Sequence, residues 1–178
     1  MQRLARSSRR WGEPLKKIRR PATEEPKLQF AVLPWRRVEK IEIMLVSSRE
    51  TGRWVLPKGW PMKGIKPHNT AAREALEEAG ILGKVAKSPL GGYSYAKRLE
   101  NGSVQICQVQ VFAFEVEQER NSWLERHERT RKWFAVADAA EAVDEPELRE
   151  AILKFGMFAM ARPKNTKSKK SQFSDNRD

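Results

Sequence analysis

Three glutamates, Glu74, Glu77 and Glu78, lie in a five-residue stretch whose sequence predicts a helix. Glu74 and Glu78 are four residues apart and therefore share one helix face, while Glu77 lies one turn from Glu74. Like charges at this spacing cost about 0.2–0.5 kcal/mol per pair. Carboxylate oxygens without His or Cys suit hard ions such as Mg²⁺ or Mn²⁺. The pattern therefore indicates either a divalent metal site or a solvated acidic face.

The residues before this helix favour the metal site. Lys58 and Gly59 are predicted to form a turn after a short strand, and Gly64 lies in the loop that follows. A loop that contains glycine lets backbone groups approach an anionic ligand, and a lysine beside it adds positive charge. The segment therefore predicts a place where a cation and a phosphate-like anion meet.

The elements that must position these residues alternate between strand and helix. Pro67 suits the first turn of a helix and Gly80 suits a left-handed stop, so the central helix is predicted over 67–79. The predicted strands cover 28–33, 41–47, 54–56, 93–99, 104–116 and 133–136, and a last helix is predicted to begin near Asp138 and continue past Pro146 to Met160. This order predicts an α/β fold with a mixed sheet and helices on its faces.

The segment from Gly59 to Ile81 resembles the Nudix box. That motif runs Gly, five residues, Glu, seven residues, Arg, Glu, an apolar residue, any residue, Glu, Glu, any residue, Gly and an apolar residue. The matching positions are Gly59, Arg73, Glu74, Ala75, Glu77, Glu78, Gly80 and Ile81. Ile65 stands where the motif has its first glutamate. In the family that position mainly supports the loop, so the departure affects the loop, and the three helix carboxylates of the motif are all present.

The resemblance implies a Nudix-type α/β/α sandwich with a mixed β-sheet and metal-dependent hydrolysis of a phosphoanhydride (pyrophosphate) bond. Glu77 would be the general base or a further metal ligand, and Glu125 or Glu128, from the loop before the last strand, would supply a base or another ligand. The implied site consists of the metal ligands Glu74, Glu78, Glu77 and Gly59, for Mg²⁺ or Mn²⁺, and the catalytic residues Glu77, Arg73 and Glu128.

Substrate choice depends on residues outside the box. The segments 54–59 and 128–134 look most like the Nudix branch that hydrolyses diphosphoinositol polyphosphates and diadenosine polyphosphates. Arginine binds phosphate oxygens through paired hydrogen bonds, so clustered basic residues fit a ligand with several phosphates. The candidate phosphate ligands are Arg53, Lys58, Lys63, Arg129 and Arg131, with solvated surface charge as the alternative for each. Trp60 and Tyr93 offer rings on which an adenine could stack.

The formal net charge of +12 is concentrated at the two ends of the chain. Residues 1–20 hold eight basic residues and one acidic residue, and residues 162–178 hold six basic and two acidic residues. We interpret 1–26 as a mobile basic arm, 27–161 as the Nudix hydrolase domain and 162–178 as a disordered basic tail. An Arg-rich start is also typical of organelle transit peptides, although Glu13 and Pro14 argue against one.

The expected partner is a small phosphorylated molecule, because neither basic end carries a motif for reading nucleic acid. No apolar run approaches the roughly 18 residues of a membrane-spanning helix, and Cys107 is the single cysteine, so we expect a soluble cytoplasmic protein. Two alternatives stay open. One is a non-catalytic Nudix-fold module that binds a phosphorylated ligand or RNA, suggested by Ile65 and the basic ends, and the other is an RNA 5′-pyrophosphohydrolase. The oligomeric state stays open too.

Overall fold

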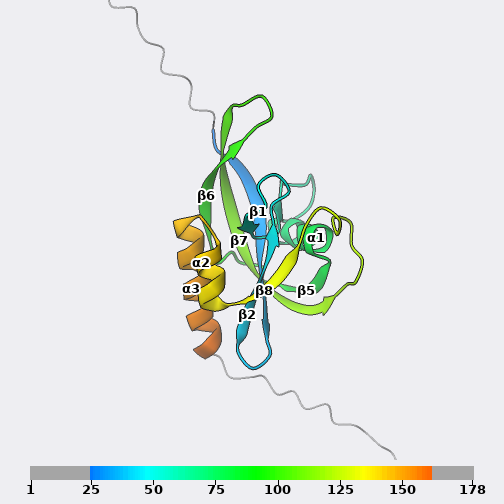
Figure 1. The fold of residues 1–178 in the computed structure, drawn as a ribbon, viewed down its shortest axis with the longest axis vertical. Coiled ribbons are helices and arrows are strands. Elements are labelled where there is room, and N and C mark those ends of the chain that lie inside the picture. Colours follow the sequence, from blue (N-terminus) through cyan, green and yellow to red (C-terminus); the bar gives the residue numbers. More distant parts are fainter. Residues whose placement is uncertain (1–24, 162–178) are drawn as a thin grey trace, which may run out of the picture.

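The computed structural model describes residues 25–161, so the interpretations of the arm before Glu25 and of the tail 162–178 lie outside the described residues. The elements are β1 (Lys27–Arg37), β2 (Ile41–Ser47), β3 (Trp54–Val55), β4 (Lys58–Gly59), α1 (Pro67–Ala79), β5 (Ile81–Val85), β6 (Gly91–Arg98), β7 (Val104–Glu119), β8 (Arg131–Ala135), α2 (Val136–Ala142) and α3 (Pro146–Ala161). The strands form one sheet in the order β3-β2-β1-β7-β5, and in addition β4 pairs with β1, β6 with β7 and β8 with β2 (Figure 1).

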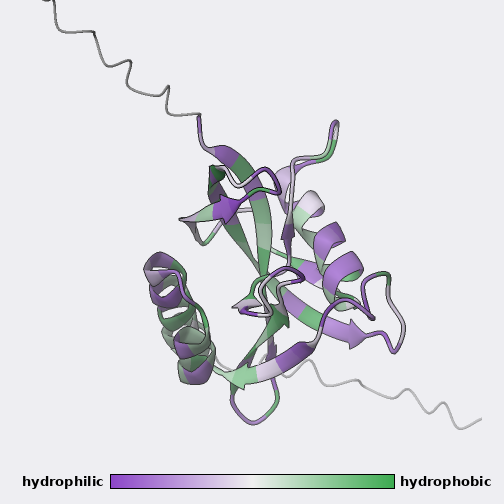
Figure 2. Cartoon of the chain, turned by 45° about the horizontal axis from the view of Figure 1, so that its top comes forward, coloured by the Kyte–Doolittle hydropathy of each residue, from purple (hydrophilic) through white to green (hydrophobic). Residues whose placement is uncertain are grey.

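Strand β1 is the centre of the sheet. It pairs antiparallel with β2 and β4 and parallel with β7, so the sheet is mixed, as predicted. Successive side chains of a strand point to opposite faces: Ala31 and Leu33 pack on the side of α2 and α3, and Phe30 and Val32 pack on the side of α1. Apolar strand segments therefore lie between two helical layers (Figure 2), which confirms the predicted α/β/α sandwich.

Helix α1 begins and ends where the sequence predicted. Pro67 lies in its first turn, and Gly80 follows its last turn in the left-handed conformation with φ 64°. The small side chains of Ala71, Ala75 and Ala79 are fully buried against the sheet. Because these residues are small, the helix can approach the sheet closely, and its acidic side chains come to lie beside β4.

Two local predictions are wrong. Residues 58–59, predicted as a turn, form the short strand β4 paired with Phe30 and Ala31 of β1. The predicted continuous helix after Asp138 is divided into α2 and α3, because Val143 is extended, with φ −96° and ψ 148°, and because Pro146 disfavours helical backbone in the residue before it. Pro146 instead begins α3, so a short polar segment separates the two helices.

Two simpler expectations can be compared with the structure. Among residues 25–161, no helix is long and apolar enough to cross a membrane. Cys107 is a free cysteine buried in β7, which agrees with the strand predicted over 104–116.

Replacing Gly80 with alanine should destabilise the fold more than the same change at Gly52. Both glycines have left-handed φ angles, 64° and 69°, so alanine costs about 1 kcal/mol of backbone strain at either position. At Gly80 the new Cβ would also lie 2.8 Å from the Trp123 side chain, whereas nothing lies within 4 Å of a Cβ at Gly52. We expect urea denaturation to show that Gly80→Ala loses about 1–3 kcal/mol more unfolding free energy than Gly52→Ala. Equal losses would show that Trp123 moves aside without cost.

Candidate active site

A cleft of about 560 Å³ opens where β4, α1, β6 and three loops meet. The loops lie between β2 and β3, between β7 and β8, and between α2 and α3. Eight of the residues predicted from the sequence line it: Arg53, Lys58, Gly59, Trp60, Glu74, Glu78, Glu125 and Arg129. Elements that are far apart in the chain therefore bring the central helix carboxylates and several predicted phosphate ligands into one cavity.

The carboxylate of Glu74 lies directly against the backbone of Gly59. A Cβ at position 59 would fall 2.1 Å from Glu74 Oε1, so a larger residue would displace the carboxylate. Burial, followed by repulsion from Glu78 and Glu77, raises the pKa of Glu74 to about 7. These surroundings disfavour the ionised form of Glu74, and a nearby cation would stabilise that form.

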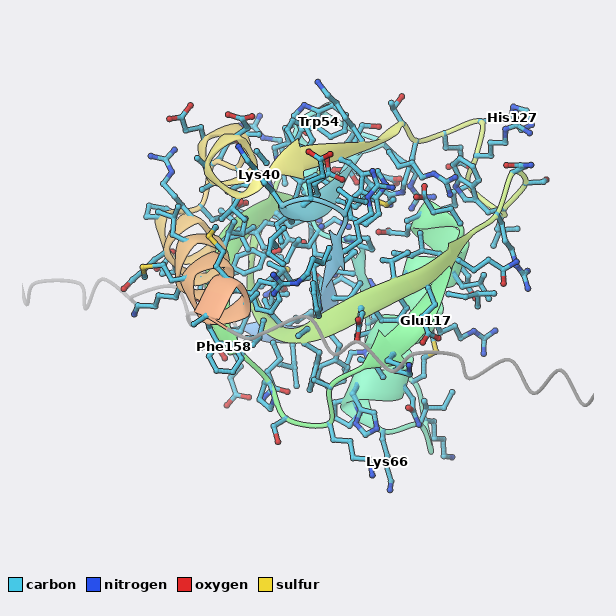
Figure 3. The ribbon with its side chains drawn as sticks, turned by 90° about the horizontal axis from the view of Figure 1, so that it is seen from below. Lys40, Trp54, Lys66, Glu117, His127 and Phe158 are labelled. Carbon is cyan, nitrogen blue, oxygen red and sulfur yellow. The ribbon has the colours of Figure 1, made fainter. Side chains whose placement is uncertain are left out.

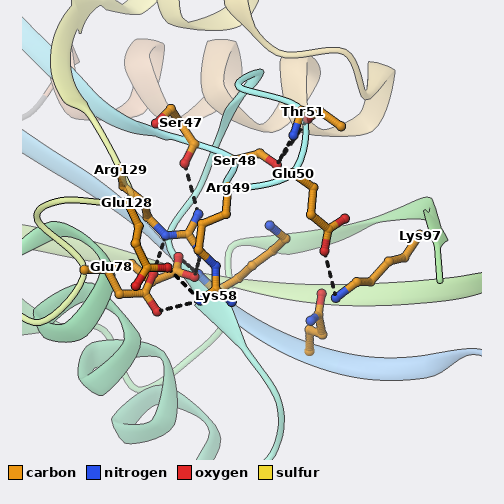
Figure 4. Close-up of polar contacts among 12 residues, drawn as sticks. Ser47, Ser48, Arg49, Glu50, Thr51, Lys58, Glu78, Lys97, Glu128 and Arg129 are labelled. Atoms are coloured by element: carbon orange, nitrogen blue, oxygen red, sulfur yellow. Dashed lines mark hydrogen bonds and ion pairs between the residues drawn. The ribbon is translucent and has the colours of Figure 1, made fainter. Parts of the chain in front are cut away.

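Glu78 is buried and connects α1 to two other parts of the site. One carboxylate oxygen accepts a hydrogen bond from the Lys58 backbone N–H at 3.1 Å, and the other pairs with the Arg129 guanidinium. Burial raises the pKa of Glu78, and the positive charges of Arg129 and Lys58 oppose the rise. Figure 4 shows these contacts joining α1, β4 and the loop before β8.

Arg129 is the cation that accompanies these carboxylates. Its side chain is only 7% exposed, its Nε donates to Glu125 Oε2 at 2.5 Å, and its Nη1 donates to the Ser47 carbonyl at 3.0 Å. Among residues 25–161, no group of three or more His, Cys, Asp or Glu side chains is arranged to hold a metal ion. The guanidinium of Arg129 therefore balances the buried negative charge of Glu78.

Arg73 and Glu77 lie at the rim of the site. They form an ion pair along the helix, with 2.8 Å between Arg73 Nε and Glu77 Oε1, and neither is among the residues that line the cleft. The Glu77 carbonyl accepts a hydrogen bond from the Glu125 N–H at 3.1 Å, which joins the loop before β8 to α1. The structure thus places Glu77 beside the cleft, and its role as general base stays a prediction.

The loop before β8 brings Glu125 into the cleft and leaves Glu128 outside it. Glu125 lies 3.5 Å from Arg49 and also pairs with Arg129. Glu128 pairs with the same Arg49 at 3.1 Å, and its side chain is 53% exposed. His127 lies at the outer tip of the loop (Figure 3). Of the two acids that the sequence offered from this loop, Glu125 is therefore the one that lines the cavity.

Lys63 and Arg131, two of the predicted phosphate ligands, do not line the cleft. Lys63 is exposed in the loop before α1. Arg131 donates to the carbonyls of Ala79 and Arg120 at 2.5 and 3.0 Å, and its Cζ lies 4.3 Å from the centre of the Trp123 ring. Because the carbonyls at the end of α1 need donors, the placement of Arg131 indicates a structural role.

Sequence reasoning missed Arg49, Tyr95 and Glu145, which all line the cleft. Arg49 and Glu145 follow the ends of regular elements, where charged residues are common, so no spacing distinguished them. Tyr93, proposed as a stacking platform, is buried in the core, and Tyr95 lines the cleft in its place. Trp60, the other aromatic candidate, does line the cleft and is 42% exposed.

Known proteins are similar to this chain in sequence and in fold. The family model of the NUDIX domain matches residues 26–155. Nudix hydrolase 12, mitochondrial, from Arabidopsis thaliana is 32% identical over 121 residues, 66% of this chain and 60% of that protein. Diphosphoinositol polyphosphate phosphohydrolase 2 from Rattus norvegicus is 32% identical over 118 residues, 66% of this chain and 63% of that protein. The matches thus span 60% of one relative and 63% of the other.

Solved structures show the same fold. The crystal structure of a C. elegans Ap4A hydrolase has a TM-score of 0.56 and 21% sequence identity, and the match covers 75% of this chain and 98% of that chain. The family match covers well over half of the chain and includes the whole segment from Gly59 to Ile81. The chain therefore belongs to the Nudix family.

Proposed function

We propose that this protein hydrolyses a phosphoanhydride bond in a nucleoside-diphosphate-linked or polyphosphorylated substrate with the help of a divalent metal ion. The observation that carries the proposal is that Glu74, Glu78 and Lys58 line one cleft. Carboxylates of this kind suit a divalent cation, and an ammonium group suits a phosphate. A site that gathers both fits a reaction between phosphates.

The chemistry of the carboxylates fits Mg²⁺ or Mn²⁺. Glu74 and Glu78 offer hard oxygen donors beside the Gly59 backbone, and the raised pKa of Glu74 reflects burial and negative neighbours that a cation would offset. These two residues and the Gly59 carbonyl would hold the ion, whereas Glu77, the other ligand that the motif offers, pairs with Arg73 outside the cleft. When bound, such an ion neutralises charge on phosphate oxygens and lowers the pKa of the attacking water.

Lys58 is the residue best suited to a phosphate oxygen. Its Nζ lies 5.5 Å from the centre of the Tyr95 ring, and burial lowers its pKa. Because burial has removed much of its hydration, an anion beside the ammonium would stabilise its charged form. Arg53 and Arg49 line the same cleft and add guanidinium donors.

Glu77 is the proposed general base, and Glu125 is the alternative. In the reaction the water oxygen forms a new bond to phosphorus, the bridging P–O bond breaks, and the water proton passes to the carboxylate. Glu77 stands on the same helix as Glu74 and Glu78, whereas Glu125 reaches the cleft from the loop before β8. Glu125 already lines the cleft, whereas the Glu77 carboxylate lies beside it in its pair with Arg73.

The substrates that we favour are diadenosine polyphosphates and diphosphoinositol polyphosphates. The names of two similar proteins, an Ap4A hydrolase and a diphosphoinositol polyphosphate phosphohydrolase, support this choice. The two alternatives are a non-catalytic module that binds a phosphorylated ligand or RNA and an RNA 5′-pyrophosphohydrolase. The complete set of Arg73, Glu74, Glu77 and Glu78 favours hydrolysis, because a binding module does not need three carboxylates.

The full chain should release phosphate or a phosphorylated product from one class of phosphoanhydride when Mg²⁺ is present. The test uses dinucleoside polyphosphates, nucleotide sugars, diphosphoinositol polyphosphates and 5′-triphosphate RNA, each with Mg²⁺ and with a chelator. We expect cleavage only with Mg²⁺. Cleavage of RNA alone would favour the RNA alternative, and no cleavage of any substrate would favour the binding module.

Replacing the base should lower turnover and leave the fold intact. We expect Glu77→Gln to reduce kcat by roughly 100- to 10,000-fold, the usual contribution of a general base, with an unchanged circular dichroism spectrum. Glu125→Gln is measured in parallel, and Glu141→Gln, an exposed change on α2, is the control for loss of one charge. A large loss in Glu125→Gln with near-normal turnover in Glu77→Gln would transfer the role of base to Glu125.

Removing the charge of Glu74 should stabilise the metal-free protein above neutral pH. Its pKa is raised from 4.5 to about 7 in the folded state, so between these values the folded protein keeps a proton that the unfolded chain releases. Stability attributable to Glu74 therefore falls as the pH rises through this window. With solvent screening taken into account, we expect Glu74→Gln to gain about 1 kcal/mol, or roughly 2–4 °C in Tm.

The measurement is thermal unfolding in a chelator at about pH 8 and again near pH 4.5. The gain should be present at the higher pH and absent at the lower one. Mg²⁺ should raise the Tm of the unmodified protein more than that of Glu74→Gln, because it binds a site that the variant lacks. An equal Mg²⁺ effect in both proteins would remove Glu74 from the metal ligands.

A further inference from the structure

Glu145 is a buried carboxylate on the wall of the cleft, at the start of α3. Only 7% of its side chain is exposed, and its Oε1 accepts a hydrogen bond from Arg53 at 2.8 Å. Its Oε2 is buried and has no hydrogen-bond partner among the described residues. An acceptor left in this state costs about 1–3 kcal/mol. The free acceptor of Glu145 is therefore available to a ligand group that can donate a hydrogen bond on this wall of the cleft.

The local sequence explains why the charge is tolerated there. Pro146 is the first residue of α3, a helix of 16 residues, so Glu145 lies immediately before the amino end of that helix. The positive end of the helix dipole stabilises a negative charge at this place, and Arg53 adds a full positive charge. Both interactions stabilise the carboxylate, yet neither gives Oε2 a donor.

The charges of the cleft do not suit a ligand with phosphates on every side. Six acidic and six basic side chains line it: Glu50, Glu74, Glu78, Glu125, Asp144 and Glu145, with Arg49, Arg53, Lys58, Lys97, Arg98 and Arg129. Four of the basic residues already pair with carboxylates, and these are Arg49, Arg53, Lys97 and Arg129. A phosphate placed near Glu145 would meet a like charge, which opposes binding.

Two aromatic rings extend along the same cleft. The Tyr95 ring lies 5.7 Å from the Arg53 guanidinium carbon, and its hydroxyl donates to Gln29 at 2.7 Å. Trp60 lines the cleft and is partly exposed. Aromatic rings of this kind stack on nucleobases. A nucleoside offers both a flat base and O–H and N–H donors, whereas a fully phosphorylated inositol offers neither.

We propose that Glu145 binds the nucleoside part of the substrate as a hydrogen-bond acceptor and thereby selects nucleoside-terminated polyphosphates over fully phosphorylated inositols. The inference rests on the proposed hydrolysis and assigns its substrate class. Arg53 positions Glu145, and the charged phosphate chain lies toward Lys58 and the α1 carboxylates. One cleft would then hold both groups, the phosphates at Lys58 and the α1 carboxylates and the nucleoside at Glu145.

The test compares Glu145→Gln with the unmodified full chain on diadenosine tetraphosphate and on a diphosphoinositol pentakisphosphate, both with Mg²⁺. Gln keeps the size of the side chain and loses the charged acceptor. For diadenosine tetraphosphate we expect kcat/KM to fall by about tenfold or more, mainly through KM. Activity on the inositol substrate should not fall. The control is Glu147→Gln, which removes the same charge two residues away, at an exposed position outside the cleft.

A measurement on the substrate side keeps the test independent of how well the variant folds. Analogues of diadenosine tetraphosphate that lack the ribose hydroxyls, or whose adenine amine is dimethylated, are assayed with the unmodified protein, and one of them should lose about tenfold in kcat/KM. An inositol substrate preferred by the unmodified protein, or no effect of Glu145→Gln and of both analogues, would overturn the proposal.

The same assays also show whether the proposed hydrolysis itself is wrong. If neither substrate is cleaved, the hydrolysis proposal fails, and calorimetry with a methylene-bridged analogue of diadenosine tetraphosphate then decides the role of Glu145. Binding that weakens about tenfold in Glu145→Gln, and not in Glu147→Gln, would support the nucleoside subsite. Equal affinity in all three proteins, or no binding at all, would exclude it.

Discussion

The burial of Glu74 and Glu78 against β4 is the constraint on which the rest of the site depends. A buried carboxylate such as Glu78 needs partners for its oxygens, and the half-buried Glu74 needs space beside the strand. Glu78 receives the Lys58 N–H and the Arg129 guanidinium, and Glu74 lies against Gly59, where a Cβ would be too close. Strand β4 is short, and its pairing with β1 fixes these backbone groups beside the helix.

Two arginines near the start of β8, Arg129 and Arg131, contact α1 at different places. Arg129 pairs with Glu78 on the cleft side, and Arg131 donates to the Ala79 carbonyl at the carboxyl end of the helix. The sequence predicted both arginines as phosphate ligands, and in the structure both donate to acceptors within the protein. Composition alone does not distinguish a guanidinium that awaits a ligand from one that already serves the fold, because the difference is set by the neighbours brought in by tertiary structure.

The parts of the fold that the sequence predicted correctly are those with local causes. Proline and glycine at its ends determine α1, and short runs of residues that favour strands determine β1 and β2. Strand β4 could not be predicted, since its pairing partner Phe30 lies almost thirty residues earlier in the chain. Glu74 and Glu78 could be predicted because the motif that contains them is local in sequence. Glu145 could not, because only the packed structure brings it to the cleft with residues of β6 and the β2–β3 loop.

Net charge and the charge of the cleft lead to different conclusions about binding. Most of the +12 comes from residues 1–20 and 162–178, whereas the residues that line the cleft include equal numbers of acids and bases. A balanced cavity attracts no polyanion through its overall charge, so affinity depends on where each charge lies. Glu74 and Glu78 reach the cleft from α1, Lys58 from β4 beside them, and Glu145 from the start of α3. Selectivity in such a cleft follows from matching uncharged donors to Glu145 as much as from matching phosphates to Lys58.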